Sequence, residues 1–144
     1  MTILSLPYNH TLGRFFSGDN RPDNIYKLNL YSAFTFNAAA TTKAAAEVGC
    51  TQLATGLGYV QNDKTLTGVV VTITGNDCFF DASNVQWIAN GGTLAASWAM
   101  LFNDSQADDP PVLAIDFGGS AAAPDGAPFD VIWSASGIVN VQTT

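Results

Sequence analysis

The chain has 144 residues, a length that suits one domain with a sizeable buried core. Hydrophobic residues make up 47% of it and charged residues only 12%, which is about half the usual fraction. The net charge is −7, and all five basic residues lie in the first 64 positions, so no basic patch exists to release counterions from nucleic acid. Such a low charged fraction is typical either of a chain that is packed against other protein chains or of a compact monomer.

The first 22 residues are predicted to form an N-terminal arm ahead of a domain at residues 23–144. The arm lacks periodicity, but it is too apolar to be a free tail, so it either packs on its own domain or docks on a partner. It has no positively charged leader and no long apolar run, so we expect neither a signal peptide nor a membrane span. Its candidate partner-binding residues are Ile3, Leu4, Leu6, Tyr8, Phe15 and Phe16.

Two segments of the first half are predicted strands. Ile25–Phe36 alternates apolar and polar residues, which indicates a strand with one face in water, the face of Lys27 and Asn29. Thr67–Thr74 is an uncharged β-branched run and also predicts a strand. Between them, the alanine-rich segment Ala38–Glu47 predicts a short helix, with a threonine N-cap, or else a loop.

The centre of the expected fold is a long strand at Thr93–Asn103. Its larger residues, among them Trp98 and Met100, recur at every second position, which predicts one large apolar face and one small one. The segment Asp104–Pro111 predicts an exposed loop, because two prolines and three aspartates interrupt the pattern. Val112–Phe117 predicts the next strand.

The remaining segments complete a set of eight or nine short strands without crossover helices. Short strands are predicted at Cys78–Asp81 and Val85–Ala89, and Ser120–Pro128 predicts a flexible loop. Phe129–Ser134 and Ile138–Gln142 are predicted to pair as a last hairpin. This pattern predicts an all-β, single-domain antiparallel β-sandwich, jelly-roll-like, with an N-terminal arm and at most one short helix.

No catalytic, cofactor-binding or metal-binding residues are predicted. His10 is the only histidine, and no nucleophile motif accompanies it. Three aspartates crowd the loop at residues 104–109, but without EF-hand spacing, so a solvated loop is preferred to a calcium site. The three tryptophans sit within strand patterns, which favours core packing over a sugar-stacking face. For Cys50 and Cys78, two buried free thiols are favoured over a disulfide.

The second half carries several motifs that recur together. Phe80-Asp81-Ala82 is followed by Val85-Gln86-Trp87 and by the long strand that ends at Asn103-Asp104. The segment Leu113-Ala-Ile-Asp-Phe-Gly-Gly119 follows, and after a loop comes Phe129-Asp-Val-Ile-Trp-Ser-Ala-Ser-Gly-Ile138. In this combination, over roughly residues 14–142, the chain resembles a family of small β-rich structural proteins of tailed bacteriophages, of the capsid decoration (cement) kind.

The resemblance implies a non-enzymatic virion structural protein without cofactors, assembled in the host cytoplasm and located on the capsid surface. Its expected partners are the major capsid protein and/or other copies of itself, as a homo-oligomer on the particle, with no nucleic acid and no membrane. The arm would dock, and the loops at 104–111 and 120–128 would face outward. A neck or tail component is the alternative within the virion. A carbohydrate-binding module on a host-contact structure is the alternative from another class.

Overall fold

The computed structural model describes residues 4–142, which form ten strands and two short helices. The helices are α1 (Thr11–Ser17) and α2 (Lys43–Ala46). No helix in this part of the chain is long and apolar enough to cross a membrane. The strands are β1 (Leu4–Pro7), β2 (Tyr26–Ala33), β3 (Thr51–Gln52), β4 (Val70–Thr74), β5 (Asp77–Asp81), β6 (Val85–Ile88), β7 (Leu94–Asn103), β8 (Pro111–Ala123), β9 (Pro128–Val131) and β10 (Val139–Val141).

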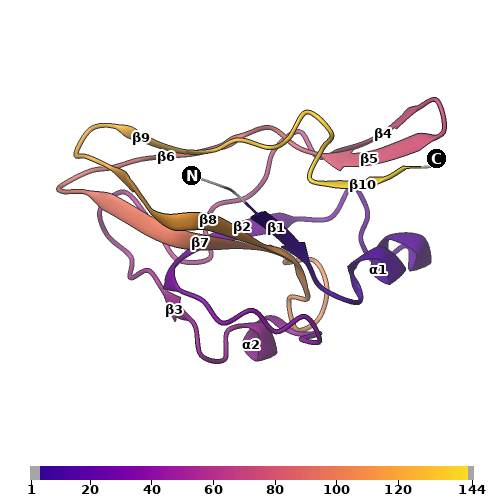
Figure 1. The fold of residues 1–144 in the computed structure, drawn as a ribbon, viewed down its shortest axis with the longest axis horizontal. Coiled ribbons are helices and arrows are strands. Elements are labelled where there is room, and N and C mark those ends of the chain that lie inside the picture. The colour runs from indigo at the N-terminus through magenta and orange to yellow at the C-terminus, as the bar shows by residue number, and fades with distance from the viewer. Residues whose placement is uncertain (1–3, 143–144) are drawn as a thin grey trace.

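The strands form two layers, as Figure 1 shows. One layer is a five-stranded sheet in the order β1-β8-β7-β2-β3. The other combines a three-stranded sheet, β10-β5-β4, with the pair β6-β9. Every strand pairing within residues 4–142 is antiparallel. The predicted all-β antiparallel sandwich is therefore confirmed, and the jelly-roll connectivity stays a prediction.

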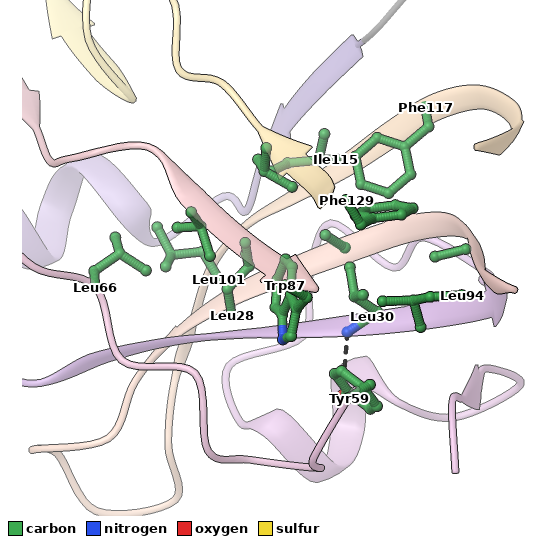
Figure 2. Packing of buried hydrophobic residues seen from close by; sticks show 14 of the residues in the cluster. Leu28, Leu30, Tyr59, Leu66, Trp87, Leu94, Leu101, Ile115, Phe117 and Phe129 are labelled. Carbon is green, nitrogen blue, oxygen red and sulfur yellow. Dashed lines mark hydrogen bonds between the residues drawn. The ribbon is translucent and has the colours of Figure 1, made fainter. Parts of the chain in front are cut away.

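The main core lies between the two layers, where the apolar faces of both meet (Figure 2). Leu28 and Leu30 of β2 and Leu101 of β7 contribute from the five-stranded sheet. Trp87 of β6 and Phe129 of β9 contribute from the opposite layer, with their ring centroids 6.2 Å apart in an edge-to-face arrangement. This burial of large apolar side chains is the main stabilising contribution to the fold.

The outer face of the five-stranded sheet is also covered, so the predicted water-facing side of β2 is wrong. Tyr31 and Met100 lie there in a second buried cluster, which includes Ala46 of α2. Asn29 is fully buried. Its amide donates to Asn62 Oδ1 at 2.7 Å, and its Oδ1 accepts from the Asn62 N–H at 3.1 Å. A polar residue in an alternating pattern thus finds a loop partner in place of water.

Two helices are present where at most one was expected. The helix expected from the alanine-rich segment is α2, and its Thr42 side chain accepts from the Ala45 N–H at 3.1 Å, as an N-cap does. The other helix, α1, lies in the arm. Its sequence has no helical periodicity, and it is held by contacts with distant strands.

The long strand β7 lies where it was predicted, but its alternation breaks near its middle. Its register with β8 shifts between Ala96 and Trp98, as a β-bulge would shift it. Ala96 and Ala99 consequently both face the main core, although they are three residues apart. Trp98 packs against the second cluster instead. The predicted single face of large residues is therefore wrong, because one extra residue moves the second half of the strand to the opposite face.

Two predictions for the C-terminal part are also wrong. The expected flexible loop at Ser120–Pro128 begins as strand, because β8 continues and Ala121–Ala123 pairs with Leu94–Ala96. The expected last hairpin does not form. β9 pairs with β6, and β10 pairs with β5 in the neighbouring sheet, so the segment between β9 and β10 passes from one sheet to the other.

Candidate docking surface

The described part of the arm packs on its own domain. β1 extends the edge of the five-stranded sheet by pairing with β8, with Leu4 opposite Asp116. α1 is fastened to the start of β8 by Thr11, which is fully buried and donates its hydroxyl proton to the Val112 carbonyl. Of the two expectations for the arm, packing on its own domain is thus observed for residues 4–22.

Of the six predicted partner-binding residues, two pack within the domain and one lies outside the described residues. Ile3 lies outside the described residues. Tyr8 is buried, and its hydroxyl donates to the Met100 sulfur at 3.5 Å. Burial raises the pKa of Tyr8 above its ordinary value. Leu6 packs against the same cluster as Tyr8. These contacts give Leu6 and Tyr8 a structural role within the domain.

The other three residues lie at the surface, in two separate places. Leu4 is 51% exposed on β1, and Phe16 is 77% exposed on α1. Phe15 is half-buried, because its ring packs against Phe80 of β5, with centroids 4.8 Å apart. Phe15 and Phe16 therefore belong to one surface, which α1 shares with the three-stranded sheet.

The position of α1 is set by hydrogen bonds of the loop that follows the helix. Gly18 ends the helix in the left-handed conformation, with φ at +84°. The loop after it is tied to the end of β7 by Asn103, whose amide donates to Asn20 Oδ1 at 2.9 Å. Gln106 adds a bond from its amide to the Asp19 carbonyl at 3.1 Å. A helix this short is not stable alone, so these contacts hold it in place.

The three-stranded sheet turns an apolar face toward α1. Residues directly opposite one another in neighbouring strands lie on the same face. One such row joins Val71, Phe80 and Val139 across β4, β5 and β10. The next row, nearer the β4–β5 turn, joins Ile73, Cys78 and Val141. No side chain in either row carries a formal charge.

α1 and this sheet face enclose an apolar groove of about 340 Å³. Its walls include Phe15 and Phe16 from the helix and Val71, Phe80 and Val141 from the sheet. Together with the remaining members of the two rows they define what we call the overhang surface: Leu12, Phe15, Phe16, Val71, Ile73, Cys78, Phe80, Val139 and Val141.

Exposure of the overhang surface increases toward the β4–β5 turn. Phe80 is buried, Val71 is 39% exposed, and Ile73 is 76% exposed. Figure 1 shows the reason, because the β4–β5 hairpin reaches past the end of the five-stranded sheet and has only α1 beneath its inner side. The hairpin keeps an inward-facing apolar pattern where the opposing layer has ended. Contiguous apolar surface of this kind marks binding sites in soluble domains.

Charge contributes little to the overhang surface. Among the described residues that line the groove only Arg21 is charged, and its Nε lies 3.2 Å from Asp23 Oδ1. Three further ion pairs engage Arg14, Lys27 and Lys43 with acidic groups of the same chain. Binding at this surface would therefore rest on apolar burial, with a weak dependence on salt.

The three tryptophans do not share a face, which removes the common sugar-stacking platform. Trp87 is buried in the main core, and Trp133 packs against that core with its indole N–H donating to the Ser83 carbonyl at 3.0 Å. Trp98 lies on the opposite face of the five-stranded sheet and stacks on Phe34, with centroids 5.2 Å apart.

Trp133 also borders a second hollow, of about 380 Å³, between β8 and β9. Phe117 and Phe129 of the main core line it, and among the described lining residues only Asp130 is charged.

The aspartates and cysteines are dispersed. Asp104 Oδ2 forms an ion pair with Lys27 Nζ at 2.8 Å. Residues 4–142 contain no group of three or more His, Cys, Asp or Glu arranged to hold a metal ion. Cys50 and Cys78 are free thiols, as favoured, although both are half-buried where full burial was expected. They lie in different parts of the fold, Cys50 beside the second cluster and Cys78 on the overhang surface.

Sequence reasoning missed most of the overhang surface. It identified Phe15 and Phe16 from the apolar character of the arm, but it did not associate them with Val71, Ile73 or Val141. The available signal was the uncharged β-branched run that forms β4. No family model, curated protein or solved structure matches this chain.

Proposed function

We propose that this chain is a non-enzymatic structural protein of a bacteriophage virion, a capsid decoration protein that binds and stabilises the major capsid shell. The sequence resemblance described above supports the virion class. The single structural observation that carries the proposal is the overhang surface, where Phe16 and Ile73 are each more than three-quarters exposed. Large apolar side chains so exposed are the expected anchors for a permanent partner.

The capsid shell is the proposed partner because a decoration protein binds through many weak contacts. A decoration protein spans joints between shell subunits, so several weak contacts made by one copy add to its affinity. The low charge of the chain suits a protein that spends its working life packed against others. Stabilisation then follows from linkage, since anything that binds the assembled shell and not its separated subunits favours the shell.

The proposal is tested with shells of the encoding phage and a double variant, Leu12→Ser with Phe16→Ser. Both residues are exposed on α1, so their replacement leaves the core intact. Burial of one such side chain contributes roughly 1.5–3 kcal/mol, so each substitution should weaken shell binding by about tenfold or more. Co-sedimentation of labelled chain with shells measures this affinity.

The matched control replaces two apolar residues that are comparably exposed but lie outside the overhang surface, Val60→Ser with Ile132→Ser. This control should bind shells as the unmodified chain does, and at 0.5 M salt binding should persist. Shells that bind neither the chain nor its variants would refute the decoration role. Binding to isolated necks or tails instead would support the alternative role, in which the same surface binds a neck or tail protein.

A further inference from the structure

We infer that β4 is a self-association edge, at which a second copy of the chain pairs antiparallel with β4 and joins the two three-stranded sheets into one six-stranded sheet. This inference names the second partner of the proposed virion protein. It rests on the geometry, sequence and charge of one edge strand, and it can be tested without any shell.

β4 is an open edge. It is the last strand in the order β10-β5-β4, and among residues 4–142 it pairs only with β5. All five of its residues are exposed. In an antiparallel ladder every second residue directs its N–H and C=O away from its neighbour, so β4 presents a row of backbone groups ready to pair with another strand.

The other edges of the sandwich carry features that block pairing, and β4 does not. β1 ends at Pro7, and β9 begins at Pro128. Lys64 covers the edge of β6 by donating from Nζ to the Gln86 carbonyl at 2.8 Å. β3 has only two residues, and β10, the opposite edge of the same sheet as β4, has only three. Proteins commonly protect edge strands with Pro, Lys or short length, so the bare edge of β4 indicates that a partner covers it.

The sequence of β4 is complementary to itself. Antiparallel pairing about its middle residue, Thr72, gives complete overlap of the five residues. On one face Val71 then lies opposite Ile73 of the other copy, and Ile73 opposite Val71. On the other face Thr72 lies opposite its counterpart. Paired β-branched residues and paired threonines are favourable cross-strand neighbours, and an antiparallel pair of identical strands closes as a two-fold dimer.

Charge also favours a second copy at this edge over other parts of the surface. The chain carries a net charge of −7, so most surfaces of two copies repel. The stretch from Thr65 to Asn76 contains no charged residue. Pairing there places no charged side chain within the two paired strands. The dimer would also place two overhang surfaces side by side, as one wider apolar surface.

Charged substitutions of Thr72, which would lie at the two-fold axis of the dimer, test the inference. Thr72→Lys and Thr72→Glu each place like charges directly opposite one another in the paired strands, so each variant alone should self-associate at least tenfold more weakly than the unmodified chain. A one-to-one mixture of the two variants should restore dimers, because unlike charges then meet. Sedimentation equilibrium over a range of concentrations measures each dissociation constant.

Ser120→Lys and Ser120→Glu are the matched controls, because Ser120 is exposed on β8, outside the overhang surface, and adds the same charges. They should keep the self-association of the unmodified chain. Hydrogen exchange gives a second readout, since amides of β4 should exchange more slowly at high concentration than at low. An unmodified chain that stays monomeric, or a mixture that fails to restore dimers, overturns the inference while leaving shell binding of a monomer open to its own test.

Discussion

The ring of Phe15 in α1 packs on the ring of Phe80 in β5, with centroids 4.8 Å apart and an angle of 59° between the planes. Phe80 also meets Tyr26 of β2 edge-to-face, at 5.1 Å. One buried ring therefore joins the arm helix, the overhanging sheet and the five-stranded sheet. The overhang surface is rigid at this end because it is continuous with the main core.

Phe80→Ala should destabilise the whole domain and release α1. Removal of a buried phenylalanine ring typically costs about 3–5 kcal/mol, through lost transfer free energy and the cavity that remains. Phe79→Ala is the control, because Phe79 is half-buried on the other face of β5 and should cost clearly less. Urea unfolding followed by tryptophan fluorescence measures both. Equal losses would contradict the role assigned to Phe80.

His10 should make the domain less stable as the pH falls below about 6.5. Burial, and then the nearby Arg14, lower the pKa of His10, while its hydrogen bond to the Pro111 carbonyl opposes them. Its Nδ1 is buried without a hydrogen-bond partner, so the neutral ring with its proton on Nε2 fits the site. The unfolded chain therefore binds more protons than the folded chain between the lowered pKa and 6.5, and stability decreases as the pH falls through that window.

His10→Gln tests this dependence, because glutamine can still donate to the Pro111 carbonyl but does not titrate. The urea midpoint of the unmodified chain should fall between pH 7.5 and pH 5.5 by more than that of the variant. Carboxylates titrate in both proteins and cancel in the comparison. Parallel pH profiles would show that His10 does not titrate on folding.

Tyr59→Phe should destabilise the domain by about 1–3 kcal/mol. The Tyr59 hydroxyl accepts from the buried Leu30 N–H at 3.2 Å, a bond visible in Figure 2, and from Gln52 Nε2 at 3.0 Å. Burial raises the pKa of Tyr59, so the hydroxyl stays protonated at neutral pH. Its removal leaves a buried amide without a partner. Tyr8→Phe is the control and should cost less, because the Tyr8 hydroxyl donates to a sulfur atom, which is a weak acceptor.

Gly58→Ala should prevent normal packing of the loop ahead of Tyr59. Gly58 has φ at +87°, and a Cβ there would lie 1.9 Å from the Ile88 carbonyl oxygen. The loop would have to move away from β6, with a loss of several kcal/mol in the free energy of unfolding. Gly126→Ala has a similar φ, +80°, but nothing within 4 Å of its Cβ, and should cost only about 1 kcal/mol. Thermal unfolding of the two variants separates steric overlap from backbone strain.

Local patterns predicted the elements that depend on local physics. The alternation in β2 and the β-branched run of β4 indicated strands, because the two-residue period of an extended backbone is visible in any segment that buries one side. The threonine cap of α2 was also predictable, because an N-cap needs only the next three residues. The apolar arm residues Phe15 and Phe16 were singled out for partner docking, which stays a prediction. What they face was not predictable, because β4, β5 and β10 are distant in sequence.

By itself, the sequence determined that this chain forms an all-β antiparallel sandwich of low charge, because strand periodicity and the scarcity of helix signals are local properties. Only the tertiary structure decided that β7 changes face after Ala96, that β9 and β10 join different sheets, and that α1 supports an overhanging hairpin. Each of these depends on which distant residues meet, such as Ala96 with Ala121 or Val139 with Phe80. The free energy of those contacts depends on two distant segments together, so the local pattern of either segment cannot predict it.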